Sequence, residues 1–479
     1  MEKKFDLALL TNYIFSFFPI SFIIGNAAVN LNLILFIILG IFHLKSKILK
    51  IKFDFLLKVI LLFFLVILIS TGLSLIKSFY SNEIQSENLN RLIKSVLFFR
   101  YFIMLLIVYA LYEHDVLNFK YFFITATVSS FLISIDIIYQ YFFGFNIIGL
   151  ERVSPLHNTG FFTDEKIAGG FIQNFSFFAI LFVSFLFRKK IYTKYLLTGL
   201  MICILGLAIF VSGNRMPFLL FLVGLVLTFI FKNDLRKIIP ATLIILLLII
   251  NFLVSKDELR KMQWVSFYDN SIGQVILMKG NLIKKNEKEN LKLEKAEILA
   301  ENKQYEDAIL TKDEEEPYYL RTSNRTRLLI TSLDIWKRNK IIGNGLKSYQ
   351  IDCFKLFRDN PDYNIDPFIY PKFKKNRTCG AHPHNYYFQT LSELGIIGLA
   401  VLLIIAFLFA AFTYKNFKFL KRGSIENYII IAAIISLFLE MFPLKSAGNI
   451  FSTNNTTYII VITSILIGCK KVMDAKIFK

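Results

Sequence analysis

The sequence predicts an all-α polytopic membrane protein, and three observations support that prediction. Hydrophobic residues fill 55% of the 479 positions, and charged residues fill 19%, below the roughly 25% of a typical soluble domain. The apolar residues are grouped in long stretches instead of being spread at the period of one globular core. The net charge of +20 arises largely from short segments between those stretches. Together these features exclude an ordinary soluble enzyme, a disordered chain and a disulfide-rich secreted module.

About twelve stretches are apolar enough and long enough to cross ~30 Å of hydrocarbon as helices. Their approximate positions are 8–24, 28–43, 55–77, 92–112, 118–143, 168–187, 195–212, 216–231, 238–255, 386–414, 426–443 and 456–470.

The loops between these stretches alternate in charge. Basic loops occur at 45–52, 188–190, 232–237 and 415–422, whereas the intervening loops are not enriched in Lys and Arg. Because cytoplasmic loops carry the positive excess, both termini are predicted to be cytoplasmic. Topology then accounts for the basic charge, and no nucleic-acid partner is expected. The first 30 residues also resemble a secretory signal peptide, which is the alternative to the uncleaved first helix that we expect.

This topology divides the chain into three parts. Residues 1–255 form transmembrane helices one to nine, residues 256–385 form a large periplasmic loop, and residues 386–479 form helices ten to twelve with a cytoplasmic tail. Within the loop, residues 284–311 have the spacing of an amphipathic surface helix. Residues 328–384 contain Pro and aromatic residues typical of irregular structure.

Two cysteines fall in the predicted external loop, Cys353 and Cys379. In an oxidising compartment such a pair commonly forms a disulfide, which we expect here. Free thiols are one alternative. A zinc site using Cys379, His382 and His384 is another, although Cys353 lies further from the others than zinc ligands usually do.

Four external segments concentrate ionisable residues, which are functional candidates at a membrane boundary because they are hard to desolvate. These segments contain Arg152 with Glu165, Arg215, Arg325, and His384 with Asn385. Each has a structural alternative: a solvated loop charge, an arginine that reaches the interface, a surface residue or a helix cap. Three Arg and one His on a single face would suit a phosphate ligand, because guanidinium groups offer forked donors and a permanent charge. No Walker loop, Asp-x-Asp pair or carboxylate cluster is visible, so we expect neither a metal nor a cofactor.

His384-Asn385, followed nine residues later by Gly395-Ile396-Ile397-Gly398, resembles the signature of the O-antigen ligase family. That family also includes O-antigen polymerases and bacterial protein O-oligosaccharyltransferases. Other segments resemble the family in the same order along the chain, namely Arg152 with Glu165 and Gly169, Arg215 in the turn Ser212–Pro217, Arg325 ahead of Gly343-Asn344-Gly345, and Pro443 with Gly448 and Phe451.

The resemblance implies a membrane glycosyltransferase of the bacterial inner membrane. Such an enzyme moves a glycan from undecaprenyl pyrophosphate to an acceptor on the periplasmic face, by an inverting reaction without a metal. The resemblance implies a catalytic role for His384. It implies substrate binding by Arg215, Arg325, Arg152, Glu165 and Asn385.

Several activities remain open at this point. The long loop after nine helices favours O-antigen ligation to lipid A–core, and O-antigen polymerisation and protein O-glycosylation are the alternatives within the family. A polysaccharide-lipid transporter is an alternative from another class. It would be expected to show broken helices near the midplane and a repeated half, and neither is visible.

Overall fold

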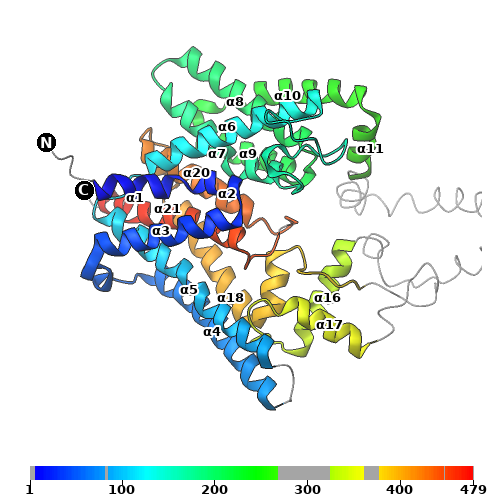
Figure 1. The fold of residues 1–479 in the computed structure, drawn as a ribbon. Helices are drawn as coiled ribbons and strands as arrows, with labels where there is room; N and C mark the ends of the chain where they lie inside the picture. Colours follow the sequence, from blue (N-terminus) through cyan, green and yellow to red (C-terminus); the bar gives the residue numbers. More distant parts are fainter. Residues whose placement is uncertain (1–5, 81–84, 268–323, 361–376, 447, 478–479) are drawn as a thin grey trace, which may run out of the picture.

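The computed structural model describes residues 6–80, 85–267, 324–360, 377–446 and 448–477, and over these residues it contains helices and no strands (Figure 1). This confirms the all-α polytopic prediction. The predicted helix at 284–311 lies outside the described residues.

The described helices, in chain order, are α1 (Leu7–Ser16), α2 (Phe18–Ile24), α3 (Asn26–Leu44), α4 (Phe55–Tyr80), α5 (Gln85–Glu113), α6 (Phe119–Phe143), α7 (Ala168–Leu186), α8 (Ile191–Val211), α9 (Arg215–Phe231), α10 (Ile238–Lys256), α11 (Glu258–Phe267), α16 (Asn324–Arg338), α17 (Tyr349–Asp359), α18 (Tyr386–Lys415), α19 (Phe417–Leu420), α20 (Ile425–Glu440) and α21 (Thr453–Ile477).

Each of the twelve apolar stretches contains a helix. Eight helices in the described part of the chain are long and apolar enough to cross a membrane, and the bent pair α1–α2 raises that number to nine. Helix α9 and the first part of α21 are shorter apolar helices. The total of about twelve spans and the three-part division of the chain therefore stay predictions.

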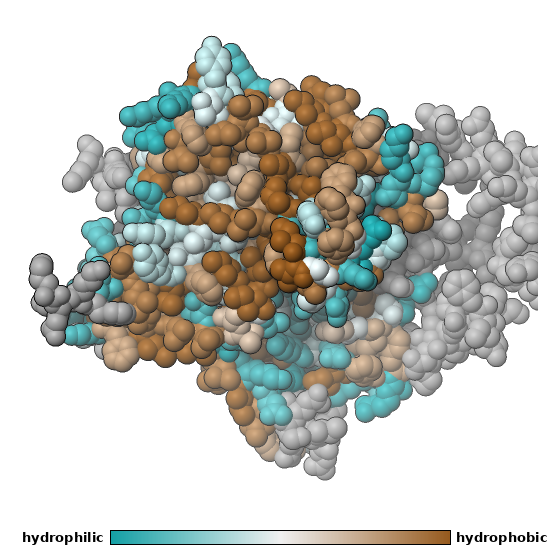
Figure 2. Space-filling model, turned by 45° about the horizontal axis from the view of Figure 1, so that its top comes forward, coloured by the Kyte–Doolittle hydropathy of each residue, from teal (hydrophilic) through white to brown (hydrophobic). Residues whose placement is uncertain are grey.

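Helix α7 lies at the centre of the bundle. It has the largest buried share of any candidate span, 67%, compared with 22% for α10. Aromatic side chains fill this core, as where Phe122 of α6 packs edge-to-face on Phe178 of α7 at 5.4 Å. Figure 2 shows hydrophobic side chains over much of the outer face, as expected for a surface in contact with lipid. Helix α1 begins and α21 ends at one end of the bundle, and α11, α16 and α17 lie at the other end (Figure 1).

Two sequence-based expectations need correction. The stretch 8–24 is not one straight helix, because α1 and α2 meet at Phe17 with a bend of 47°. Pro19 stands at the start of α2, where its missing N–H interrupts the helical ladder. Residues 328–384 are not irregular throughout, since α16 and α17 occupy part of them. Their polar and apolar residues alternate at helical spacing, which we underweighted beside the Pro and aromatic content.

Helix α18 is interrupted at Gly395, whose φ of +66° is outside the helical region. The backbone N–H groups of the next two residues, Ile396 and Ile397, therefore bond outside the helix. They donate to the carbonyls of Lys340 at 2.9 Å and Ile341 at 3.2 Å, in the turn after α16. The backbone of the turn after α16 thus supplies the acceptors that the break in α18 leaves missing.

Gly343 and Gly345 allow this close approach. The N–H of Gly345 donates to the carbonyl of Glu393 at 2.7 Å, just before the break. A Cβ atom added at Gly343 would lie 2.3 Å from that same carbonyl oxygen, and φ at Gly343 is +73°. Ser70 of α4 donates from Oγ to the carbonyl of Ile342 at 2.7 Å. The glycine turn, α4 and α18 therefore form one junction, which we call the glycine junction.

Replacing Gly343 by Ala should lower the melting temperature of the purified protein by several degrees. The added methyl group collides with backbone, and the positive φ disfavours a side chain, which together correspond to about 1–3 kcal/mol. The matched control is Gly170→Ala, because Gly170 lies in α7 with no atom within 4 Å of the added Cβ. That variant should melt at or slightly above the wild-type temperature. Equal melting of the Gly343→Ala and wild-type proteins would contradict the close packing of the junction.

Candidate active site

The turn before α9 carries Arg215, the first residue of that helix. The neighbouring Asn214 ties this turn to the end of the loop between α6 and α7. Its Oδ1 accepts from the N–H of Gly169 at 3.0 Å, and its Nδ2 donates to the carbonyl of Lys166 at 2.8 Å. A Cβ at Gly169 would lie 2.3 Å from Ser212 Oγ, so only glycine fits without rearrangement. The two segments that the sequence analysis singled out are therefore in direct contact.

The loop between α6 and α7 is anchored on α6 by buried polar side chains. Gln140 accepts from the N–H of Gly160 through Oε1 at 2.8 Å, and Asp136 accepts from the N–H of Ile147 through Oδ1 at 3.0 Å. Both side chains are fully buried. The anchoring holds the loop against the turn that precedes Arg215.

His157, in this loop, was missed by the sequence analysis. It packs against Gly213 in the turn before Arg215, and its Nδ1 lies 2.9 Å from Ser154 Oγ. Burial lowers the pKa of His157, and the positive charges of Lys166, Arg215 and Arg260 lower it further. His157 is therefore held neutral inside a cationic environment. No motif spacing marks it in the sequence.

Arg325 lies in the first turn of α16, near Arg215 of α9. Partial burial of its guanidinium group lowers the pKa of Arg325, and the positive charge of Arg215 lowers it further. The two arginines are therefore close enough to repel each other, although they come from segments far apart in the sequence. A shared anionic ligand would remove that repulsion.

Arg260 of α11 is a second residue that the sequence analysis missed. It is fully buried, and its Nη1 donates to the carbonyl of Val211 at 3.2 Å, at the end of α8. Its Nε donates to Asp257 at 3.3 Å, while its Nη2 is buried without an acceptor among the described residues. Arg260 thus fastens α11 beside the turn that carries Arg215. In the sequence it is one Arg in a long charged segment.

Arg152 and Glu165 are both exposed, and the described contacts do not bring them to Arg215 or Arg325. Arg152 lines an open hollow whose other walls are Phe143, Gly144, Phe145, Glu151, Val153, Ser154 and Pro155. Substrate contact by Arg152 and Glu165 stays a prediction from the sequence.

His384 lies two residues before α18, exposed and with a φ of +56°. Its ring centroid is 4.2 Å from that of His382. Burial lowers the pKa of His382 to about 4, and the nearby His384 lowers it as well. The Nε2 atom of His382 is buried without a partner among the described residues. His382 is therefore a neutral ring that packs on His384 near neutral pH.

Asn385 caps the first turn of α18. Its Oδ1 accepts from the N–H groups of Tyr387 at 3.0 Å and Phe388 at 3.2 Å. Its Nδ2 donates to the carbonyl of Pro443 at 2.7 Å, in the last external loop. Both polar atoms of the side chain are thus used within the protein. We propose that Asn385 positions the adjacent His384, in place of the direct substrate contact implied by the resemblance.

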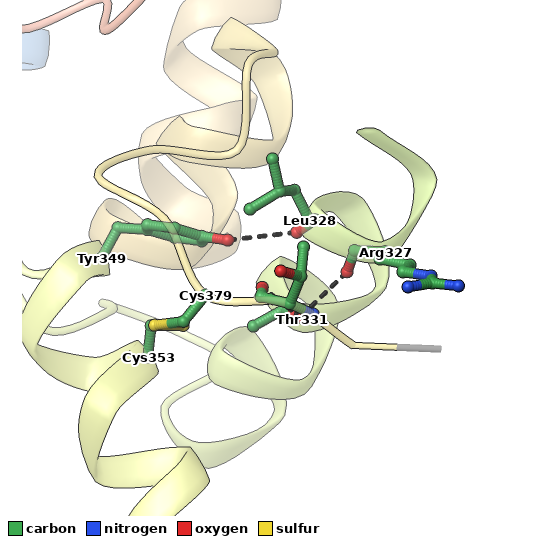
Figure 3. Close-up of a disulfide and its surroundings, with 7 residues drawn as sticks. Arg327, Leu328, Thr331, Tyr349, Cys353 and Cys379 are labelled. Carbon is green, nitrogen blue, oxygen red and sulfur yellow. Dashed lines mark hydrogen bonds between the residues drawn. A yellow bond between two sulfur atoms is a disulfide. The ribbon is translucent and has the colours of Figure 1, made fainter. Parts of the chain in front are cut away.

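The segment before His384 is fastened to α16 and α17. Cys379 forms a disulfide with Cys353 of α17, so its sulfur is not free for the zinc alternative (Figure 3). Thr331 of α16 donates from Oγ1 to the carbonyl of Thr378 at 3.0 Å. Tyr349 of α17 donates from its hydroxyl to the carbonyl of Leu328 in α16 at 3.2 Å. The helix that carries Arg325 and the segment that carries His384 therefore form one unit.

The chemistry available here is that of two guanidinium groups and, on the segment before α18, an exposed imidazole. Arg215 and Arg325 can bind an anionic group from two directions, since each offers forked donors. His384 is exposed, and a neutral imidazole can accept a proton.

Comparison with known proteins matches residues 199–403 to the family described as O-antigen ligase. No curated protein matches the chain. The matched residues include the turn with Arg215, helix α16 with Arg325, the disulfide, His384, and the glycines at 343, 345 and 395. The match over residues 199–403 therefore supports the resemblance to the O-antigen ligase family that the motifs indicated.

Proposed function

We propose that this protein transfers a glycan from undecaprenyl pyrophosphate to an acceptor at the periplasmic face of the bacterial inner membrane. The family match supports a membrane glycosyltransferase of the O-antigen ligase or polymerase type. The observation that carries the finer proposal is the approach of Arg215 to Arg325, from α9 and α16. Two neighbouring guanidinium groups suit a ligand with two phosphates.

The proposed step is an inverting displacement at the anomeric carbon of the donor sugar. The acceptor hydroxyl attacks that carbon while His384 takes its proton. The bond between the anomeric carbon and the pyrophosphate oxygen breaks, and undecaprenyl pyrophosphate leaves with the bonding electrons. Arg215 and Arg325 stabilise the negative charge that develops on the leaving group. Since two permanent charges do this, the proposed step needs no divalent metal, and transfer should continue in EDTA.

Among the family activities we propose O-antigen ligation to lipid A–core, with both protein termini in the cytoplasm. Deletion of the gene separates this from polymerisation. Loss of a ligase leaves carrier-linked polymer and uncapped lipid A–core, whereas loss of a polymerase leaves core capped with one repeat. Any result other than carrier-linked polymer with uncapped lipid A–core would replace ligation by another transfer reaction.

Arg215→Lys and Arg325→Lys should each reduce transfer at least ~10-fold in a purified assay with carrier-linked glycan. Lysine keeps the charge but lacks the planar fork that bonds two phosphate oxygens at once. Arg236→Lys is the matched control, because Arg236 lies exposed between α9 and α10, outside the site. Full transfer by both site variants would show that these side chains do not clamp the pyrophosphate.

His384→Ala should bind the donor normally and transfer glycan at least ~100-fold more slowly, because a general base typically contributes 10²- to 10⁴-fold. His382→Phe is the control, since phenylalanine keeps a ring beside His384 and removes both nitrogens. It should stay within about tenfold of wild type.

The pH profile gives an independent check on the same pair. His382 has a pKa of about 4 and stays neutral above pH 5. A fall in rate on acidification above pH 5 would therefore not come from His382, and with His384 as the base it should persist in His382→Phe. Its disappearance in that variant, or near-normal transfer by His384→Ala, would remove His384 as the base.

A further inference from the structure

A second group of basic side chains lies where α5 meets the residues that follow Gly345. Arg91 of α5 donates from Nε to the carbonyl of Leu346 at 3.1 Å, so α5 packs directly on this turn. Lys94 is three residues further along and therefore on the same face of α5 as Arg91. Lys347 directly follows Leu346. Lys94 and Lys347 thus belong to one junction between α5 and the unit formed by α16, α17 and the segment before His384.

Arg100 extends this group further along α5. Its Nη2 donates to Asn30 Oδ1 at 3.2 Å and to the hydroxyl of Tyr101 at 3.0 Å. Its Nε is buried without an acceptor among the described residues. Partial burial of the Lys347 ammonium lowers the pKa of Lys347, and the charges of Lys94 and Arg100 lower it further. The nearby carboxylate of Glu393 raises it. Lys347 therefore lies within electrostatic reach of Lys94 and Arg100.

Two described carboxylates lie at this junction, Asp352 and Glu393, and neither forms an ion pair with a lysine here. Asp352 Oδ2 accepts from Asn344 Nδ2 at 3.0 Å. Glu393 is buried, and its Oε1 accepts from Gln389 Nε2 at 3.0 Å. Its Oε2 accepts from the backbone N–H of Lys347 at 2.5 Å, not from the ammonium group. No ion pair involves Lys94, Arg100 or Lys347 in the described part of the chain. Among the described residues, neither carboxylate pairs with the ammonium groups of Lys94 and Lys347, and an anion could neutralise them.

The surface beside this cluster is apolar and faces the membrane. Ile93, Val96 and Leu97 flank Lys94 and are 50%, 54% and 55% exposed. They lie near the start of the candidate span Leu89–Glu113, at the depth where lipid headgroups meet acyl chains. A ligand with a phosphate and attached acyl chains fits such a boundary, since the phosphate meets cations while the chains cover apolar side chains.

We propose that Lys94 and Lys347 bind a phosphate on the headgroup of the acceptor lipid. This site is separate from the donor site at Arg215 and Arg325, and it rests on the proposed function in that it requires a lipid acceptor. Both sites adjoin the external unit that carries His384: Arg325 belongs to α16, and Lys347 follows the glycine junction. The two lipids would thus be held by their phosphates on either part of one rigid unit.

The test compares the full-length protein with the double variant Lys94→Gln/Lys347→Gln. Both side chains are exposed and form no described ion pair, so the variant should fold. Binding of diphosphoryl lipid A and of the same lipid treated with phosphatase is measured by native mass spectrometry. The wild type should prefer the phosphorylated lipid at least ~10-fold, and the variant should lose that preference. The control Lys58→Gln/Lys120→Gln removes the same charge from exposed positions in α4 and α6 and should keep it.

Two outcomes would overturn the inference. An equal preference in the wild type and the double variant would show that these lysines do not read the phosphate. Equal binding of phosphatidylglycerol and diphosphoryl lipid A would show a general site for anionic lipid instead of an acceptor site. Because these readouts are binding constants, they are independent of activity. If the wild type bound phosphorylated lipid A as expected yet transferred no glycan, the proposed function would fail and the site would stand.

Where transfer does occur, the same variant gives a second measurement. The KM for phosphorylated acceptor should rise about tenfold, while the KM for the carrier-linked donor stays unchanged. A matching rise in both would contradict separate sites.

Discussion

The interruption of α18 at Gly395 is the constraint on which the rest of the site depends. Backbone N–H groups freed from a helix at membrane depth must find other acceptors, because each unsatisfied group is destabilising by several kcal/mol. The carbonyls of Lys340 and Ile341 meet that need, and glycines at 343 and 345 let the two backbones approach. The unit formed by α16, α17 and the segment before His384 is thereby fixed to α18 by backbone hydrogen bonds. Ser332 of α16 adds a further link, since its Oγ donates to the carbonyl of Phe388 in α18 at 2.8 Å.

The proposed site draws its residues from two parts of the molecule. The helix bundle contributes Arg215 at the start of α9, and the unit formed by α16, α17 and the segment before α18 contributes Arg325 and His384. The arginines keep their charge at any physiological pH, so binding of a pyrophosphate would not depend on pH in that range. The imidazole of His384, when neutral, can accept a proton, which suits a group that must take one during the reaction. Asn385 and His382 hold its surroundings in place without themselves titrating near neutral pH.

Much of the fold followed from the sequence, because long apolar stretches leave a chain few alternatives to membrane helices. The order of Arg215, Arg325 and His384 was likewise visible, since short motifs mark each of them. The sequence could not show that Gly343 and Gly395 meet, because a backbone contact between distant segments leaves no trace in spacing. It also concealed Arg260 and His157. Their importance comes from tertiary neighbours, a helix end and a cluster of cations, and their local sequence resembles any charged loop.

The convergence of Arg215 and Arg325 on one ligand is the central claim, and a structure of the full-length protein with bound undecaprenyl pyrophosphate tests it most directly. Electron cryo-microscopy of the complex should show the pyrophosphate between α9 and α16, with oxygen atoms within hydrogen-bonding distance of both guanidinium groups. His384 should then face the position of the departing sugar. A pyrophosphate bound elsewhere, or held by only one of the two arginines, would contradict the account.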